Sequence, residues 1–150
     1  MSATLTTGAT RTAGLTLRVI TPNRIAFDET VESVRLPGAD GQFGVLPHHA
    51  PLVAALDAGL LRYRQGGVEH LLYISGGFCE VRDSTVRVIT ESGERPQDID
   101  EERARKAEVR ARERLSGRRS QDGEPVDHER AVAALARAIM RLRAREFREE

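Results

Sequence analysis

The chain has 150 residues, and its 23 Lys and Arg side chains balance 23 Asp and Glu side chains. This zero net charge argues against a general electrostatic attraction to nucleic acid or anionic lipid. No apolar run approaches the length of a membrane-spanning helix, and one cysteine, Cys79, cannot form an internal disulfide. Residues 1–14 carry Arg11 but no acid and no apolar core, so we expect a flexible extension and no secretory signal.

Short segments of alternating apolar and polar residues fill residues 15–96. Such segments, separated by turn residues, are typical of an antiparallel β-sandwich or flattened barrel. The expected strands are 15–19, a strand from 25 that bends between 31 and 34, 52–56, 60–64, 68–74, 78–82 and 86–90. Gly66 and Gly67 predict a tight hairpin turn, because both accept left-handed backbone angles.

Residues 97–150 are rich in charge, and their apolar spacing is that of helices. Asp98 and Glu101 fit a capping box, which predicts a first helix from Asp98 to about Leu115. Its expected apolar face is Ala104, Ala107, Ala111 and Leu115, and that of a second helix, 127–148, is Val132, Leu135, Ile139 and Leu142. Joined by a hydrophilic loop, the helices predict an antiparallel hairpin that needs a host surface for stability.

Residues 41–52 hold two glycines, two prolines and two adjacent histidines in twelve positions. Pro47 and Pro51 lack an amide donor, and Gly41 and Gly44 permit tight turns. This composition predicts a corner where the chain passes from one layer of the sandwich to the other.

Two motifs together indicate a family. A glycine-rich turn leads into Leu-Pro-His-His-Ala-Pro-Leu at 46–52, and Ser-Gly-Gly-Phe-Cys-Glu-Val follows at 75–81. In this order they resemble the epsilon subunit of F-type ATP synthases, over about residues 15–147. The long loop after the first helix and the extension before Leu15 depart from the common pattern.

The resemblance implies a non-catalytic rotor subunit of a proton-translocating ATP synthase, peripheral to the cytoplasmic face of a bacterial plasma membrane. Its β-sandwich, 15–96, would couple rotation of the membrane c-ring to the gamma shaft. Its hairpin, 97–150, would inhibit ATP hydrolysis by entering the alpha/beta catalytic hexamer. The implied gamma contacts are Leu46, Pro47 and His49, and the implied c-ring contacts are Asp40, Gly41 and Gln42.

Residues 99–104 read Ile-Asp-Glu-Glu-Arg-Ala, which matches a motif with which some bacterial members bind ATP. The implied ATP-binding residues are Glu94, Asp100 and Arg103, with Arg110, Arg137 and Arg141 as helpers by spacing. The alternative is that Asp100 caps a helix and pairs with Arg103 at the surface. ATP would then be a regulator, and no cofactor is required.

The residues themselves do not indicate a catalyst. The four histidines lack metal-ligand spacing, and Cys79 has no second cysteine with which to hold zinc. No Gly-Lys-Ser/Thr follows the glycines, and Ser75 does not lie in a nucleophile elbow. The alternative function is a free-standing β-sandwich binding module with a charged helical tail.

Overall fold

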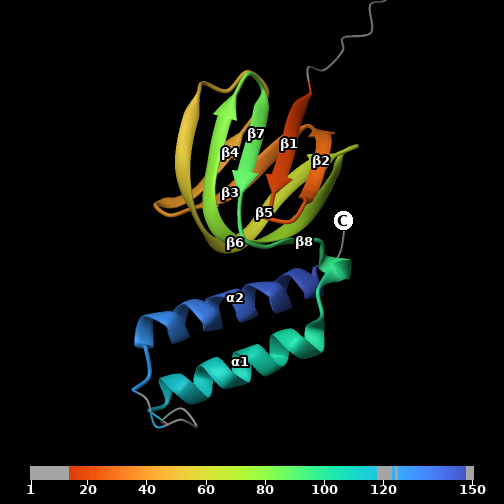
Figure 1. Ribbon diagram of the computed structural model, residues 1–150. Helices are drawn as coiled ribbons and strands as arrows, with labels where there is room; N and C mark the ends of the chain where they lie inside the picture. The colour runs from red at the N-terminus through yellow and green to blue at the C-terminus, as the bar shows by residue number, and fades with distance from the viewer. Residues whose placement is uncertain (1–13, 118–122, 124, 148–150) are drawn as a thin grey trace, which may run out of the picture.

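The computed structural model describes residues 14–117, 123 and 125–147, which form a folded sheet above two helices (Figure 1). Its strands are β1 (Leu15–Ile20), β2 (Ile25–Val31), β3 (Ser33–Gly38), β4 (Gly41–Val45), β5 (Leu52–Gln65), β6 (Val68–Arg82), β7 (Thr85–Ile89) and β8 (Gly93–Glu94). A 3-10 turn, η1 (Pro96–Asp98), leads to the helices α1 (Glu101–Leu115) and α2 (His128–Glu146). The predicted β-sandwich followed by two helices is confirmed.

The strand order is β2-β1-β7-β6-β5-β3-β4, and β8 pairs with β6. The long strands β5 and β6 pair from Leu52↔Val81 to Gln65↔Val68 and bend, so the sheet folds over on itself (Figure 1). We expected an antiparallel arrangement throughout, and one pairing differs from it: β1 and β7 run parallel. Alternation within a strand carries no information about the direction of its neighbour.

The predicted breaks in β5 and β6 are wrong. Residues 52–56 and 60–64 belong to one strand, and so do 68–74 and 78–82. The pairing continues on both sides of Gly76 and Gly77, which have φ angles of 101° and 118°. These glycines bend the strand and do not end it, which is a common use of glycine inside a sheet.

The region from 25 to 52 also differs in part. The expected bend between 31 and 34 is a break at Glu32 that separates β2 from β3. The first five residues of the glycine- and proline-rich stretch form β4, so only 46–51 make the corner. Paired backbone can include glycine when a neighbouring strand supplies the hydrogen bonds, and β3 does so here.

The main core fills the space between the two layers of the sandwich. It is built from Leu, Val, Ile, Phe, Tyr and Cys side chains of β1 to β7. A smaller cluster joins the sandwich to the helices through Tyr73, Ile99 and Ala144, with Leu60 and Met140 packed against it. The helical hairpin therefore has a small apolar attachment to its host.

The start of α1 corrects the predicted capping box. Asp100, not Asp98, is the N-cap, and its Oδ1 accepts a hydrogen bond from the Arg103 amide at 3.0 Å. Asp98 belongs to the 3-10 turn that Pro96 begins, and Ile99 is extended. In the second helix, Asp127 caps the start through the Arg130 amide at 3.1 Å. The expected end at residue 148 lies outside the described residues.

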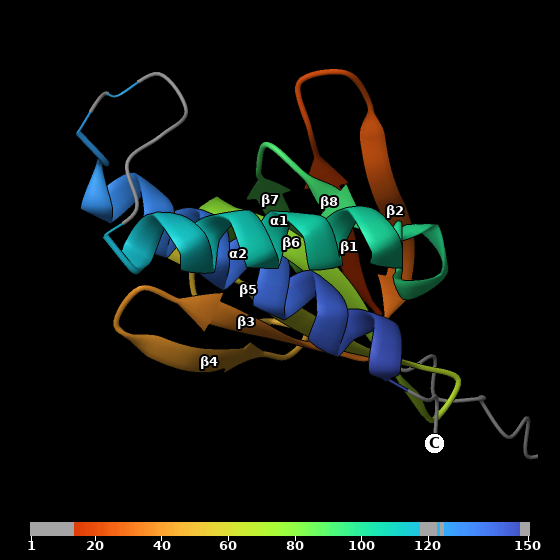
Figure 2. The same cartoon turned by 90° about the horizontal axis from the view of Figure 1, so that it is seen from below.

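The buried face of the helices consists of alanines. It comprises Ala104 and Ala111 on α1 and Ala131, Ala138 and Ala144 on α2. Val132 of the predicted stripe is 48% exposed, so that part of the prediction is wrong. Small side chains let two helix backbones approach closely, which explains their selection at the contact. α2 lies between the sandwich and α1 (Figures 1 and 2).

Candidate functional site

A pocket of about 470 Å³ lies where the sandwich meets the hairpin. Five of the six predicted ATP-binding residues line it, namely Glu94, Asp100, Arg103, Arg110 and Arg141. Ser92, Asp98, Ala104 and Ala107 complete the lining. Arg137, the sixth, does not line this pocket, although its charge acts on the nearby Tyr73. We call this space the arginine pocket.

Arg141 and Glu94 connect α2 to β8 across the edge of the arginine pocket. The Arg141 Nε lies 3.1 Å from Glu94 Oε2, and its Nη2 lies 3.0 Å from Oε1. Both side chains are only 26% exposed. Burial acts to lower the pKa of Arg141, but the hydrogen bonds that it donates to Glu94 and the field of Tyr73 outweigh burial and raise that pKa. Arg141 therefore keeps its charge.

Tyr73 lies directly against this ion pair. The Arg141 Cζ is 4.6 Å from the centroid of the Tyr73 ring, which is a cation–π geometry. Tyr73 is fully buried, and its hydroxyl has no hydrogen-bond partner among the described residues. Burial raises the pKa of Tyr73, so the hydroxyl keeps its proton at neutral pH.

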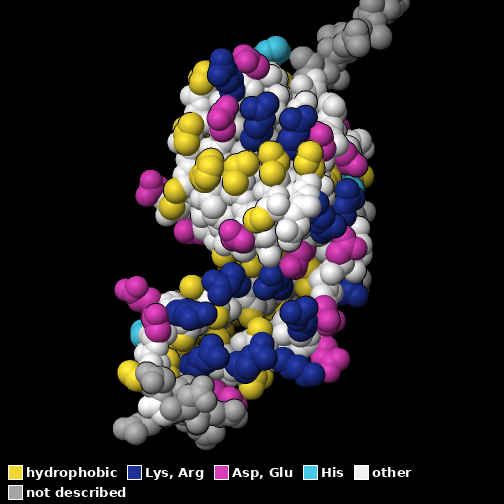
Figure 3. Space-filling view, viewed as in Figure 1, with side chains coloured by type: hydrophobic (Ala, Val, Ile, Leu, Met, Phe, Trp, Pro, Cys, Tyr) yellow, Lys and Arg dark blue, Asp and Glu magenta, His cyan; other side chains and the backbone are white. Residues whose placement is uncertain are grey.

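Four arginines of α1 form two contrasting pairs. Arg105 and Arg112 face solvent and pair with acids four residues back, Arg105 with Glu101 and Arg112 with Glu108. Arg103 and Arg110, which line the pocket, have no ion-pair partner among the residues that the structure describes. Lys and Arg side chains gather over the hairpin below the sandwich (Figure 3). The pocket thus offers uncompensated guanidinium groups, which suit a phosphate-bearing ligand.

Asp100 has one of the two roles that the alternative interpretation gave it, the helix cap, but not the surface pair with Arg103. Its carboxylate accepts the Arg103 amide and caps α1. No ion pair with the Arg103 guanidinium is present in the described part of the chain. Arg103 is therefore left available, while Asp100 fixes the start of the helix that carries it.

The predicted gamma contacts lie in the corner after β4. Leu46 is 63% exposed, and His49 is half-buried with its Nδ1 2.7 Å from the carbonyl oxygen of Ala50. The His48 amide donates to Ser84 Oγ at 2.9 Å, which fastens the corner to the turn between β6 and β7. That turn is at the end of the sandwich remote from the hairpin (Figure 1).

The predicted c-ring contacts lie at the turn between β3 and β4, with Asp40 in the turn and Gly41 and Gln42 at the start of β4. Asp40, Gly41 and Gln42 are all exposed there, and the φ angle of Gly41 is 127°. The five residues of β4 separate this turn from Leu46, a span of roughly 17 Å for an extended strand. The two predicted contact sets therefore lie at opposite ends of one strand.

Sequence reasoning missed an exposed apolar row on the sandwich. Phe78 is 50% exposed, Ile25 57% and Ile89 36%. Neighbouring strands place them in register in the order Ala55, Phe78, Ile89, Ile20 and Ile25. A band of hydrophobic side chains crosses this face (Figure 3). The available signal was that Phe78 alternates with the buried Cys79, and so points outward.

A row of charged residues borders the apolar row. Arg18 pairs with Asp28 at 3.2 Å, and Arg87 with Glu80 at 4.0 Å. Arg18 lies two residues from Ile20, Arg87 two from Ile89 and Glu80 two from Phe78. Residues two apart in a strand share a face, so the charged row lies beside the apolar row. This face therefore combines an uncovered apolar centre with a polar border, as protein interfaces do.

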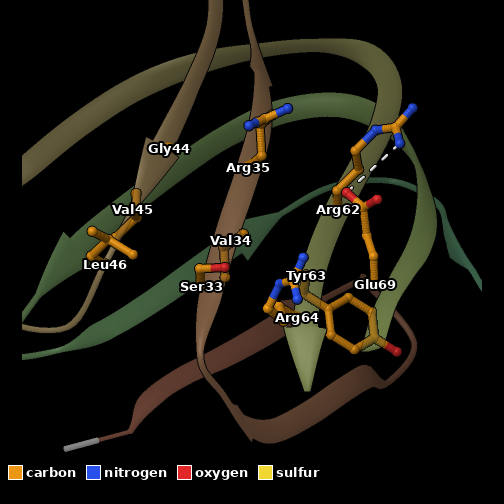
Figure 4. Close-up of a pocket in the computed structure, with 10 residues that line it drawn as sticks. All are labelled: Ser33, Val34, Arg35, Gly44, Val45, Leu46, Arg62, Tyr63, Arg64 and Glu69. Carbon is orange, nitrogen blue, oxygen red and sulfur yellow. Dashed lines mark ion pairs between the residues drawn. The ribbon is translucent and has the colours of Figure 1, made fainter. Parts of the chain in front are cut away.

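A second open pocket lies over β3, β4 and β5 (Figure 4). Arg35, Arg62 and Arg64 line it, and Arg62 pairs with Glu69 at 3.7 Å. Leu46, one of the predicted gamma contacts, also lines this pocket. Among the described residues, no group of three His, Cys, Asp or Glu side chains is placed to hold a metal ion. In the same residues no helix combines the length and the apolar character needed to cross a membrane.

Comparison with known proteins agrees with the fold and the motifs. The family model for the beta-sandwich domain of the ATP synthase Delta/Epsilon chain matches residues 14–96, and that for its long alpha-helix domain matches 97–146. The ATP synthase epsilon chain of Nitratidesulfovibrio vulgaris strain DP4 is 49% identical over 131 residues, 87% of this chain and 95% of the relative. That of Desulforamulus reducens is 45% identical over 130 residues, 87% of this chain and 96% of the relative.

Solved structures show the same fold. A chain of the Euglena gracilis mitochondrial ATP synthase, in an OSCP/F1/c-ring assembly, has a TM-score of 0.69 and 26% identity, with 85% of this chain and 78% of that chain covered. A chain of the Tetrahymena thermophila mitochondrial central stalk and c-ring has a TM-score of 0.57 and 13% identity, covering 87% and 96%. The chain described here belongs to the ATP synthase Delta/Epsilon chain family.

Proposed function

We propose that this chain is a non-catalytic rotor subunit of the central stalk of a bacterial proton-translocating ATP synthase. Its sandwich contacts the gamma shaft and the c-ring, so that rotation of the ring turns the shaft. Through that complex the chain is peripheral to the cytoplasmic face of the plasma membrane. The bacterial relatives and the mitochondrial stalk assemblies support this assignment.

The exposed apolar row is the observation that carries the contact with gamma. Phe78, Ile25 and Ile89 leave a continuous apolar surface on a rigid sheet. A contiguous patch of this kind on a protein marks a surface that a partner covers. The ion-paired border of Arg18 and Asp28 supplies the polar rim. The corner at Leu46, Pro47 and His49 extends this contact.

The turn at Asp40, Gly41 and Gln42 is the proposed contact with the c-ring. It is exposed, polar and supported by a paired strand on each side. This turn and Leu46 lie at opposite ends of β4, so one rigid domain can contact two partners at once. Rotation can then pass from the ring to the shaft without dissipation in a flexible joint.

The hairpin has the properties of a regulatory arm. Its attachment includes the small cluster around Tyr73, the Arg141–Glu94 pair and a hydrogen bond from Arg145 to the Pro96 carbonyl. An attachment of limited area allows a second state in which the helices leave the sandwich and enter the alpha/beta hexamer, where they inhibit hydrolysis. ATP bound in the arginine pocket stabilises the attached state, because that pocket requires residues from both parts.

Co-purification with the organism's own gamma subunit tests the proposal. The full chain is expected to elute with gamma as a one-to-one complex, and Phe78→Asp is expected to abolish co-elution. Val132→Asp is the matched control, since Val132 is a similarly exposed apolar residue on the hairpin. Failure of the wild-type chain to bind gamma would favour a free-standing binding module. Equal binding by Phe78→Asp would reject the apolar row as the contact.

A further inference from the structure

We propose that the Tyr73 hydroxyl is a phosphate-binding group of the arginine pocket, which becomes accessible when a ligand phosphate replaces Glu94 as the partner of Arg141. The proposal rests on nucleotide binding at that pocket, as put forward above. It adds a residue of β6 to the predicted nucleotide-binding residues, which otherwise come from β8 and from the helices and their N-cap.

The first observation is the state of the hydroxyl. Tyr73 is 0% exposed, and its hydroxyl oxygen has no hydrogen-bond partner among the described residues. Buried hydroxyl groups are nearly always hydrogen-bonded, because an unpaired one forfeits its interaction with water. Phenylalanine would fill the same apolar surroundings of Ile99 and Ala144 without that penalty. The hydroxyl therefore calls for a partner that enters from outside.

The second observation is the position of Arg141. One face of its guanidinium covers the Tyr73 ring at 4.6 Å, while its edge holds Glu94 in two hydrogen bonds. The same Arg141 lines the arginine pocket. Arg141 therefore touches both the arginine pocket and the buried ring, and a change in its partner exposes the face of that ring toward the pocket.

The charges around Tyr73 favour an anion as that partner. Arg141 and Arg137 on α2 act on Tyr73 as cations, and Glu94 on β8 acts as the opposing anion. A phosphate that draws Arg141 away from Glu94 bonds the Arg141 guanidinium on α2 and the Tyr73 hydroxyl on β6 at once, so it keeps the hairpin attached in place of the ion pair. Arg103 and Arg110 on α1 remain free for the rest of a phosphate chain. Hydrogen bonds to a charged acceptor are stronger than those between neutral groups, so the hydroxyl adds measurably to the affinity for ATP.

Isothermal titration of the full chain with ATP tests the proposal. Tyr73→Phe is expected to weaken ATP binding about tenfold, the effect of losing one hydrogen bond to a charged group. Tyr63→Phe is the matched control, because it removes a hydroxyl from a buried tyrosine that packs on Phe27, away from the pocket, and it should leave the affinity unchanged. The unfolding midpoint of Tyr73→Phe without ATP should equal or exceed that of the wild type.

Tripolyphosphate and adenosine identify the part of the nucleotide that the hydroxyl contacts. Tyr73→Phe is expected to weaken tripolyphosphate by the same factor as ATP and to leave adenosine unaffected. Wild-type binding of ATP with equal binding by Tyr73→Phe would overturn the role of Tyr73 alone. An effect confined to adenosine would overturn the assignment to phosphate. Absence of ATP binding by the wild type would overturn this inference together with the proposed nucleotide regulation, while leaving the gamma contact intact.

Discussion

Arg141 of α2 holds Glu94 of β8 in a two-point ion pair, with N–O distances of 3.1 and 3.0 Å. The two residues are 47 positions apart, and between them they join the hairpin to the sandwich. The pair also borders the pocket where an anion is expected to bind. Attachment of the hairpin and occupancy of the pocket are consequently linked through one guanidinium group.

Replacing Arg141 is expected to loosen the hairpin. Arg141→Ala removes the ion pair and the contact over Tyr73, and it leaves the half-buried Glu94 without its partner. We expect a loss of about 1–2 kcal/mol in the attachment, which is below the fully buried range because both groups retain some solvent. Amide hydrogen exchange should rise across α1 and α2 and stay unchanged in β1.

Arg112→Ala is the control for that experiment. Arg112 pairs with Glu108 on the outer surface of α1 and touches no part of the sandwich in the described structure. Its loss is expected to change stability by less than about 0.5 kcal/mol. Equal exchange in the two variants would show that the Arg141–Glu94 pair does not hold the hairpin.

The N-cap of α1 is a second test. Asp100→Ala is expected to destabilise the hairpin by about 1 kcal/mol, because the Arg103 amide loses its acceptor. Asp98→Ala should have little effect, since Asp98 caps no helix. Circular dichroism during thermal unfolding measures both variants. A larger loss for Asp98→Ala would restore the capping box that the sequence suggested.

The free arginines of the pocket give a third prediction. Arg103→Ala and Arg110→Ala are each expected to weaken ATP binding about tenfold or more, because each removes a pocket-lining guanidinium that forms no ion pair in the described structure. Arg105→Ala should have no effect, since Arg105 faces solvent and pairs with Glu101. Fluorescence anisotropy with a labelled ATP analogue measures the three affinities. A uniform loss in all three would indicate a general charge effect instead of a site.

Alkaline pH is expected to release the hairpin. Burial raises the pKa of Tyr73 above its ordinary value of 10.0, so the folded state holds the phenolic proton more tightly than the unfolded state does. The associated stability is complete below pH 10 and is lost as the pH rises through the raised pKa of the folded state. The protection factors of the α2 amides, which correct for base-catalysed exchange, should therefore fall above about pH 10.

Tyr73→Phe separates this effect from other alkaline changes. The variant has no proton to lose at this position, so its helices should stay attached to a higher pH. The buried thiol of Cys79 also has a raised pKa, but it lies in the main core and is unchanged in the variant. Identical pH profiles for the two proteins would assign the alkaline transition to another group.

The sequence alone determined the family and the kinds of element. Motifs such as the one at 75–81 are local, and alternation or helical spacing depends only on which neighbours share a face. Such patterns predicted a β-sandwich, two helices and most of the residues that line the arginine pocket. They overestimated the breaks at Gly76 and Gly77, because a glycine that bends a strand and one that ends it have the same local signature.

Only the tertiary structure decided which distant side chains meet. The parallel pairing of β1 with β7, the row from Ala55 to Ile25 and the contact of Arg141 with Tyr73 all join segments far apart in the chain. On α2 the structure buries Ala131 and Ala138 and exposes Val132 of the predicted stripe, because close approach of two helix backbones favours the smallest side chains. Each is fixed by packing of whole layers against one another, and no local pattern encodes the direction, register or distance of such contacts.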